Sequence, residues 1–248
     1  MNASLTLDTM VLEKAIIEWR HAPAYLQWDR AGILTRNLER EIPGLSVFGA
    51  QPNSIQLRVP PNTELVSELE SHRIVATRPQ RTLKDFQDKT DTFSRIVHQT
   101  LDITRFIRIG FRIIYSKITK DRDEAANLIL NTKRIRLPEH KASEPIFGKI
   151  VLPEVAIRTE GKTLGLSHRL KAETRRYELD IPIEFPDNIV SGPKGGISKE
   201  ADYAILDVDY YTTAPVISDQ LIIKDWIESG FRTIKQEADK FLRRGGND

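Results

Sequence analysis

Two arginines at strand spacing are the first residues in this sequence whose chemistry stands out. Residues 105–117 contain a strict alternation of side chains over ten positions. Because a β-strand points successive side chains to opposite faces, Arg108, Gly110 and Arg112 are expected on one face, with Gly110 leaving room between two fixed positive charges. The opposite face is predicted to be core, and its residues are Ile107, Ile109, Phe111, Ile113 and Tyr115.

Two aspartates repeat this spacing later in the chain. Asp207 and Asp209 lie in a predicted strand and point to the same face. Two bare carboxylates on one face repel, so we expect cationic partners, and Arg108 and Arg112 have the matching spacing. We favour a structural set of ion pairs. A polar ligand site in which all four residues handle phosphate is the second interpretation, and a Mg²⁺ site at the two aspartates is the third.

A second group of basic residues raises the question of nucleic-acid binding. The group flanks a predicted turn between two strands and consists of Arg169, Lys171, Arg175 and Arg176. Clustered cations of this kind bind phosphate backbones or acidic protein surfaces. The interpretation we favour is a solvated hairpin whose charge is balanced by Glu173 and Glu178.

The sequence contains no recognisable catalytic or cofactor motif. Its five histidines have neither HxxH nor HxxxH spacing, and no serine stands in a G-x-S-x-G sequence. The glycine-rich stretch 192–196 lacks the spacing of a phosphate-binding P-loop and is interpreted as a hairpin tip. We therefore predict no catalytic residue, no metal site and no cofactor.

The composition narrows the class of protein and its compartment. The 248 residues include no cysteine, which excludes disulfides, thiolate catalysis and cysteine zinc sites and favours a reducing cytoplasm. A formal net charge of +2 argues against wholesale nucleic-acid binding. The N-terminus lacks an apolar run of signal-peptide length, and no segment has the apolar length of a membrane span. We expect a cytoplasmic protein without a membrane partner.

Hydrophobic periodicity predicts the elements that must position these residues. In the first half they are strands at 11–20, 54–59, 73–78 and 105–117, with helices at 23–42 and 83–101. In the second half they are a helix at 123–130, strands at 150–158, 162–170, 176–183 and 203–211, and a helix at 219–243. Glu160-Gly161 is predicted to form a hairpin turn, and Ser218 to cap the last helix.

These elements indicate an α+β fold with mostly antiparallel sheets in two interlocked lobes. The first lobe, residues 1–120, has the strand–helix–strand–strand–helix–strand order of a ferredoxin-like fold. The second lobe, residues 121–248, combines an antiparallel sheet with the long C-terminal helix, which is expected to lie across that second sheet. A single integrated domain is the alternative.

Several of these segments resemble an uncharacterised, sporadically distributed prokaryotic protein family of about this length. The similar segments are the strand Arg108–Arg112, the strand Leu206–Asp209, the helix end Ala238–Leu242 and the opening 11–18. Thr9-Met10 stands where that family usually has a proline before its first strand. The resemblance implies a mobile or defence-related gene neighbourhood and no known activity.

Our leading hypothesis for function is a non-catalytic interaction protein that binds a protein partner or a second copy of itself. It rests on the lack of an identifiable nucleophile, metal cluster or cofactor loop. The first alternative is a phosphate- or nucleotide-handling enzyme that uses the two arginines and two aspartates. The second is nucleic-acid binding through the basic residues of 168–176.

Overall fold

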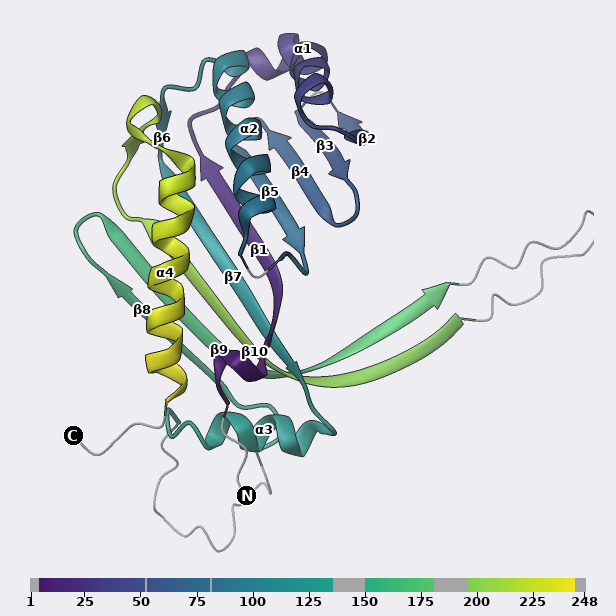
Figure 1. Cartoon of the computed structure of the whole chain (residues 1–248), viewed down its shortest axis with the longest axis vertical. Coiled ribbons are helices and arrows are strands. Elements are labelled where there is room, and N and C mark those ends of the chain that lie inside the picture. Colours follow the sequence, from purple (N-terminus) through teal and green to yellow (C-terminus); the bar gives the residue numbers. More distant parts are fainter. Residues whose placement is uncertain (1–4, 52, 81, 136–149, 181–195, 244–248) are drawn as a thin grey trace, which may run out of the picture.

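The main body of the protein is a single antiparallel sheet with helices on one face (Figure 1). The computed structural model describes residues 5–51, 53–80, 82–135, 150–180 and 196–243. Nine strands form the sheet in the order β2-β3-β4-β5-β1-β7-β10-β9-β8. Their bounds are β1 Val11–Arg20, β2 Ser46–Gln51, β3 Ser54–Val59, β4 Thr63–Glu68, β5 Ser71–Thr77, β7 Arg108–Ile118, β8 Glu154–Glu160, β9 Leu164–Asp180 and β10 Gly196–Thr212. Two short strands, β6 Arg105–Phe106 and β11 Val216–Ile217, pair with each other.

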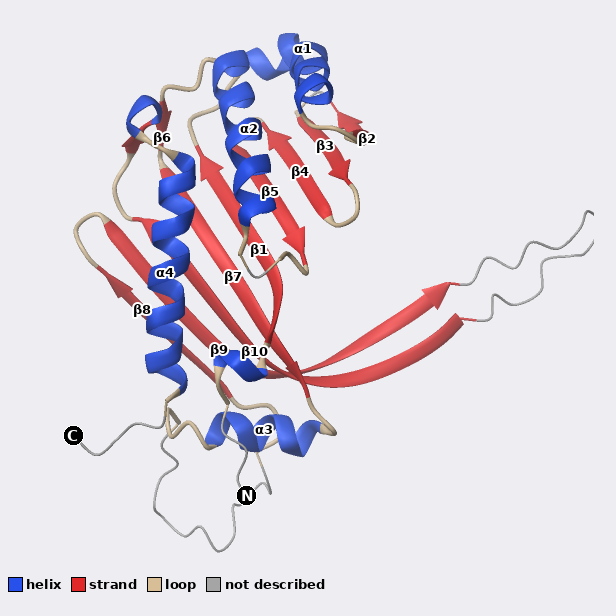
Figure 2. Cartoon of the chain, viewed as in Figure 1, coloured by secondary structure: helices blue, strands red, loops and turns tan. Residues whose placement is uncertain are grey.

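Helices cover one face of this sheet and leave the other open in the described part of the chain (Figure 2). The helices are α1 Leu26–Glu41, α2 Lys84–Leu101, α3 Arg122–Leu130 and α4 Ile223–Leu242, with short 3-10 turns at Leu7–Thr9 and Ser218–Gln220. The core lies between the helices and the covered face, where large side chains such as Trp19, Phe93 and Phe111 are fully buried. None of the helices in the described ranges is long and apolar enough to cross a membrane.

The predicted ferredoxin-like order is present in the first half of the chain. Strand β1, helix α1, strands β4 and β5, helix α2 and strand β7 occur in this order along the chain, and the four strands lie in the order β4-β5-β1-β7. The β2–β3 hairpin is inserted between α1 and β4, so the predicted strand 54–59 is β3 and its place in the ferredoxin-like order is taken by β4. Three strands were not predicted from the sequence, β2, β4 and the two-residue β11. Strand β2 escapes prediction because it is an exposed edge strand with Gly49 at an irregularity in its register. The β2–β3 hairpin extends the sheet beyond the ferredoxin-like part.

Strands from both halves of the chain share the one sheet. Strand β7 pairs with β1 on one side and with β10 on the other, so the predicted lobes meet along β7 and β10. Helix α4 packs against β10, β7 and α2 and therefore lies across this continuous sheet. Its buried stripe includes Ile227, Ile234 and Ala238, as its helical spacing predicts. At Gly230, an added Cβ would come within 2.9 Å of Tyr210 Cδ1 on β10, which shows how closely the helix approaches the sheet.

The predicted turn between residues 170 and 176 is wrong. The structure has one strand of 17 residues, β9, where two strands were predicted. The intervening residues are mostly polar and charged, but they include no glycine or proline and they continue the strand alternation. Leu170 and Ala172 are buried on the covered face, while Lys171 and Glu173 form an ion pair on the open face.

Three further details differ from the sequence predictions. Ile107 is not core: its side chain is 57% exposed, because it lies at the break between β6 and β7. Ser218 does not cap the last helix, since α4 begins at Ile223 after the 3-10 turn. Pro23 precedes the first turn of α1 by three residues. Of the glycine-rich stretch 192–196, residues 192–195 lie outside the described residues.

Candidate functional site

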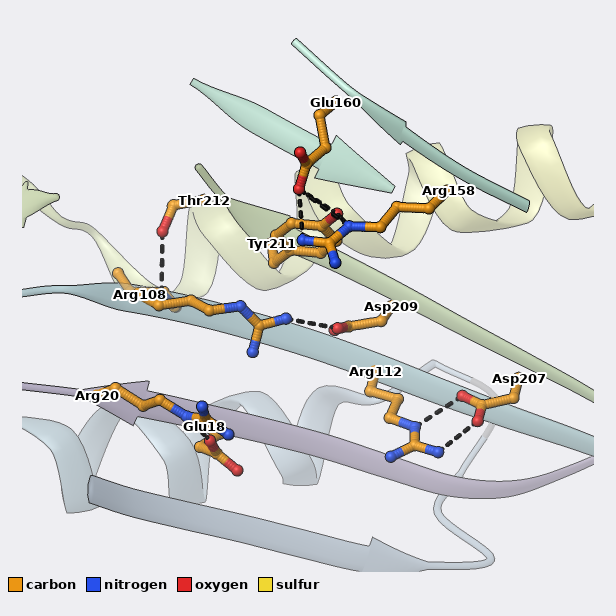
Figure 3. A network of polar contacts seen from close by, with 11 residues as sticks. Glu18, Arg20, Arg108, Arg112, Arg158, Glu160, Asp207, Asp209, Tyr211 and Thr212 are labelled. Atoms are coloured by element: carbon orange, nitrogen blue, oxygen red, sulfur yellow. Dashed lines mark hydrogen bonds and ion pairs between the residues drawn. The ribbon is translucent and has the colours of Figure 1, made fainter. Parts of the chain in front are cut away.

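The arginine and aspartate strands lie side by side at the centre of the sheet. Strand β10 pairs with β7 in an antiparallel register that places Asp209 opposite Arg112 and Tyr211 opposite Gly110. Because side chains alternate along each strand, Arg108, Arg112 and both aspartates project from the open face, away from the helices (Figure 3). The structure thus brings together the four residues that the sequence analysis linked.

Arg112 pairs with Asp207, its diagonal neighbour, whereas Arg108 extends past Gly110 to Asp209, the residue opposite Arg112. Arg108 Nη2 donates to Asp209 Oδ2 at 2.6 Å, and Arg112 Nε donates to Asp207 Oδ1 at 2.7 Å. A second bond from Arg112 Nη2 to Asp207 Oδ2 completes a two-pronged contact, the geometry that gives guanidinium–carboxylate pairs their directionality. Diagonal neighbours in a sheet remain within reach of long side chains, so the residue directly opposite is not necessarily the bonded partner.

Gly110 leaves the space that the first ion pair occupies. A Cβ at this position would lie 3.3 Å from Arg108 Nη1 and 3.3 Å from Asp209 Oδ1. That spacing is tighter than ordinary van der Waals contact, so a larger residue would press on both partners. The sequence-based expectation that the glycine makes room beside the arginines agrees with this geometry.

The two ion pairs differ in their solvation. The hydrogen bonds and charge of Asp207 raise the pKa of Arg112, whose side chain is 46% exposed. Burial raises the pKa of Asp209, although Arg108 acts in the opposite direction. Desolvation disfavours the ionised carboxylate, and here it outweighs the attraction of the partner.

Tyr211 belongs to the same cluster, and the sequence analysis did not single it out. The guanidinium carbon of Arg108 lies 4.6 Å from the centre of its ring, and that of Arg158 lies 5.2 Å away. Its hydroxyl accepts from Arg158 Nε at 2.6 Å and donates to Glu160 Oε1 at 2.9 Å. Strand alternation in the sequence could have identified Tyr211, because it follows Asp207 and Asp209 on the same strand face. Arg158 and Glu160 gave no such signal, because their contacts depend on where β8 lies.

Gly165 on β9 leaves the room that the ring of Tyr211 occupies. A Cβ at this position would lie only 2.5 Å from Tyr211 Cε2 and Cζ. The aromatic ring therefore covers the glycine, a cross-strand contact that no other residue type would permit without moving the ring. Burial raises the pKa of the Tyr211 hydroxyl, and its hydrogen bond to Glu160 acts in the same direction.

The four basic residues predicted as a nucleic-acid surface lie along β9 and do not flank a turn. Three of them, Arg169, Lys171 and Arg175, share the open face with the aspartates, and Arg176 points to the other face. Arg169 pairs with Glu154 at 2.8 Å, and Arg175 pairs with Glu13 at 2.6 Å. Lys171 contacts Glu173, and Arg176 contacts Ser198.

The open face carries a set of matched charges on β1, β7, β8, β9 and β10. Seven cations pair with seven carboxylates on five strands, and we call these fourteen residues the ion-pair array. The pairs are Arg20–Glu18, Arg108–Asp209, Arg112–Asp207, Arg158–Glu160, Arg169–Glu154, Lys171–Glu173 and Arg175–Glu13. Within the described ranges, no three His, Cys, Asp or Glu residues are grouped to hold a metal ion. The array offers fixed hydrogen-bonding groups and little net charge.

The fold and the array define an α+β protein with an uncovered, charge-paired sheet face. A scan of the sequence against models of known protein families finds no match, and a search of curated proteins finds none either. The family resemblance noted in the sequence therefore stays a prediction.

Proposed function

We propose that this protein is a non-catalytic interaction protein that binds another protein surface through the open face of its sheet. The observation that carries this proposal is a set of three arginine–tyrosine stacks on that face. Arg108 and Arg158 lie over Tyr211, and Arg175 lies 5.1 Å from the ring centre of Tyr203. Arginine and tyrosine are enriched among the residues that dominate protein–protein binding energy.

The partner that best fits the charge pattern is a second copy of this chain. In a two-fold symmetric contact a surface patch meets itself, so a patch of one charge sign would repel its copy. The ion-pair array has seven charges of each sign and avoids that repulsion. Its side chains are partly exposed, such as Arg112 at 46% and Arg158 at 67%, and are free to exchange partners with a facing copy.

The β9–β10 ribbon adds a second reason for an interaction role. Beyond Lys171, β9 has no pairing with β8, and before Tyr203, β10 has no pairing with β7 in the described residues. The two strands continue together as a two-stranded arm that extends away from the sheet (Figure 1). Both edges of the arm present backbone groups without sheet partners, and such edges recruit further strands.

The alternative functions have weaker support. A phosphate-handling role for Arg108, Arg112, Asp207 and Asp209 would require an anion to displace a carboxylate from each arginine. Nucleic-acid binding through the β9 cations faces the same competition from Glu154, Glu173 and Glu13. A role in a mobile or defence-related gene system rests on the sequence resemblance alone.

Light scattering coupled to size-exclusion chromatography tests the proposal, across micromolar to near-millimolar protein concentration. We expect a concentration-dependent dimer that dissociates as salt increases, because screening weakens exposed ion pairs. Arg158→Glu should abolish the dimer, while Arg232→Glu on the outer surface of α4 should leave it intact. A monomer at every concentration would overturn self-association. Dimerisation that survives Arg158→Glu would place the contact elsewhere.

A further inference from the structure

Helices α1 and α2 line an open polar cavity that the ion-pair array does not touch. The cavity has a volume of about 600 Å³, within the usual range for small-molecule sites. Its lining includes three arginines, Arg30, Arg40 and Arg95, and two amides, Asn37 and Gln99. It lies in the helical layer, on the side of the sheet opposite the ion-pair array.

The cations in this cavity outnumber the acids by three to one. Arg95 forms an ion pair with Glu41, the one acidic residue of the lining. Arg30 Nη1 donates at 2.8 Å to the carbonyl oxygen of Thr100, near the end of α2. Three positive charges and one negative charge leave the lining with a formal charge of +2. This differs from the open face, where every cation of the array has its own carboxylate.

Arg40 is the cavity cation that has no partner. Within the described ranges its side chain makes no hydrogen bond and no ion pair, and it is exposed on the last turn of α1. A guanidinium carries five N–H donors in a planar fork that matches carboxylate and phosphate oxygens. Arg30 keeps further donors free beyond its one bond to Thr100.

We infer that this cavity binds a doubly charged oxyanion group of a small molecule, a phosphate or a dicarboxylate, through the guanidinium of Arg40, with Arg30 as a second cation of the same lining. The formal charge of +2 matches a dianion. The amides of Asn37 and Gln99 supply further polar contacts, and Ile33 and Ile96 line the cavity for an apolar part of the ligand. This inference is independent of the proposed interaction role, because it uses other residues on the other side of the sheet.

Isothermal titration calorimetry of the full chain tests the inference, with inorganic phosphate, pyrophosphate and succinate as separate probes at matched ionic strength. We expect at least one probe to bind with one-to-one stoichiometry. Binding of phosphate or pyrophosphate alone would identify a phosphate site, and binding of succinate alone a dicarboxylate site. Arg40→Gln should weaken that binding about tenfold or more, the effect of losing one charge-assisted contact.

Arg36→Gln is the matched control. Arg36 is an exposed arginine on the same helix, but it lines a different groove, beside Val47 and Ala50. Arg36→Gln should leave the affinity for the probe unchanged. Both Arg36→Gln and Arg40→Gln should have the wild-type melting temperature, because both positions are exposed. The inference is overturned if no probe binds at millimolar concentration, or if Arg36→Gln weakens binding as much as Arg40→Gln.

Discussion

Arg108 on β7 donates a 2.6 Å hydrogen bond to Asp209 on β10, and this contact joins residues 101 positions apart in the chain. It lies at the seam where the two halves of the protein share one sheet. Asp209 is 23% exposed and Arg108 30%, so the pair is half-buried. Contacts of this kind contribute more than a fully exposed ion pair but still include a desolvation cost.

The diagonal pairing predicts which charges are energetically coupled. In a double-mutant cycle, Arg112→Ala and Asp207→Ala should show a coupling energy of about 1 kcal/mol, since Asp207 is only 12% exposed. The exposed pair Arg232–Glu228 on α4 is the control and should show about 0.3 kcal/mol. Chemical unfolding at low salt measures both cycles. Additive losses for Arg112 and Asp207 would mean that their contact does not contribute to stability.

Two helix glycines should respond to alanine in opposite directions. Gly230→Ala places a Cβ 2.9 Å from Tyr210 Cδ1 and 3.0 Å from Phe111 Cδ1, so α4 must move away from the sheet. We expect a loss of about 1–3 kcal/mol in unfolding free energy. Gly32→Ala on α1 meets no atom within 4 Å and should add about 0.5–1 kcal/mol through helix propensity. Urea unfolding of both variants measures the two changes in unfolding free energy. Equal changes in Gly230→Ala and Gly32→Ala would contradict the close packing of α4 against the sheet.

The position of Tyr211 depends on Gly165. Gly165→Ala introduces a Cβ that would overlap the Tyr211 ring, so the ring should leave its place between Arg108 and Arg158. The raised pKa of the Tyr211 hydroxyl should then return toward its ordinary value of 10.0 as the ring becomes solvated. Ultraviolet titration of tyrosine ionisation measures this change. Gly161→Ala in the adjacent turn is the control, because its nearest contact is an ordinary 3.4 Å. An unchanged titration in Gly165→Ala would show that the ring is not held there.

Three neighbouring histidines predict acid sensitivity. His21 Nδ1 donates to the carbonyl oxygen of Ala22 at 2.7 Å, so its Nε2 accepts the 2.9 Å bond from His72 Nε2. Burial lowers the pKa of His72 well below 6.5, and burial lowers that of His98 from 6.5 to about 4. These side chains are therefore neutral in the folded protein at pH values where the unfolded chain would protonate them.

The sign of the pH effect follows from this difference. Above pH 6.5 both states are neutral at these histidines and stability is fully present; below it, the unfolded chain binds more protons and stability falls. For His98 the loss between pH 6.5 and about 4 amounts to about 3 kcal/mol. His98→Phe keeps an aromatic ring beside Phe106 and should flatten the dependence of unfolding free energy on pH. A slope identical to wild type would assign the acid sensitivity to other groups.

Local patterns in the sequence were sufficient for the strand faces and the long helix. The two-residue alternation of a strand is a property of the backbone, so the shared face of Arg108 and Arg112, and that of Asp207 and Asp209, followed from spacing alone. The apolar stripe of α4 followed from its helical period for the same reason.

Only the tertiary structure decided which elements are neighbours. The aspartate partners of the arginines, the placement of Arg158 and Glu160 around Tyr211, and the arginine-rich cavity between α1 and α2 all depend on contacts between distant segments. The tertiary structure also decided that β9 is one continuous strand. Leu170 and Ala172 are buried on the covered face of the sheet, while Lys171 and Glu173 form an ion pair on the open face. Such contacts are set by packing, and packing has no local signature in the chain.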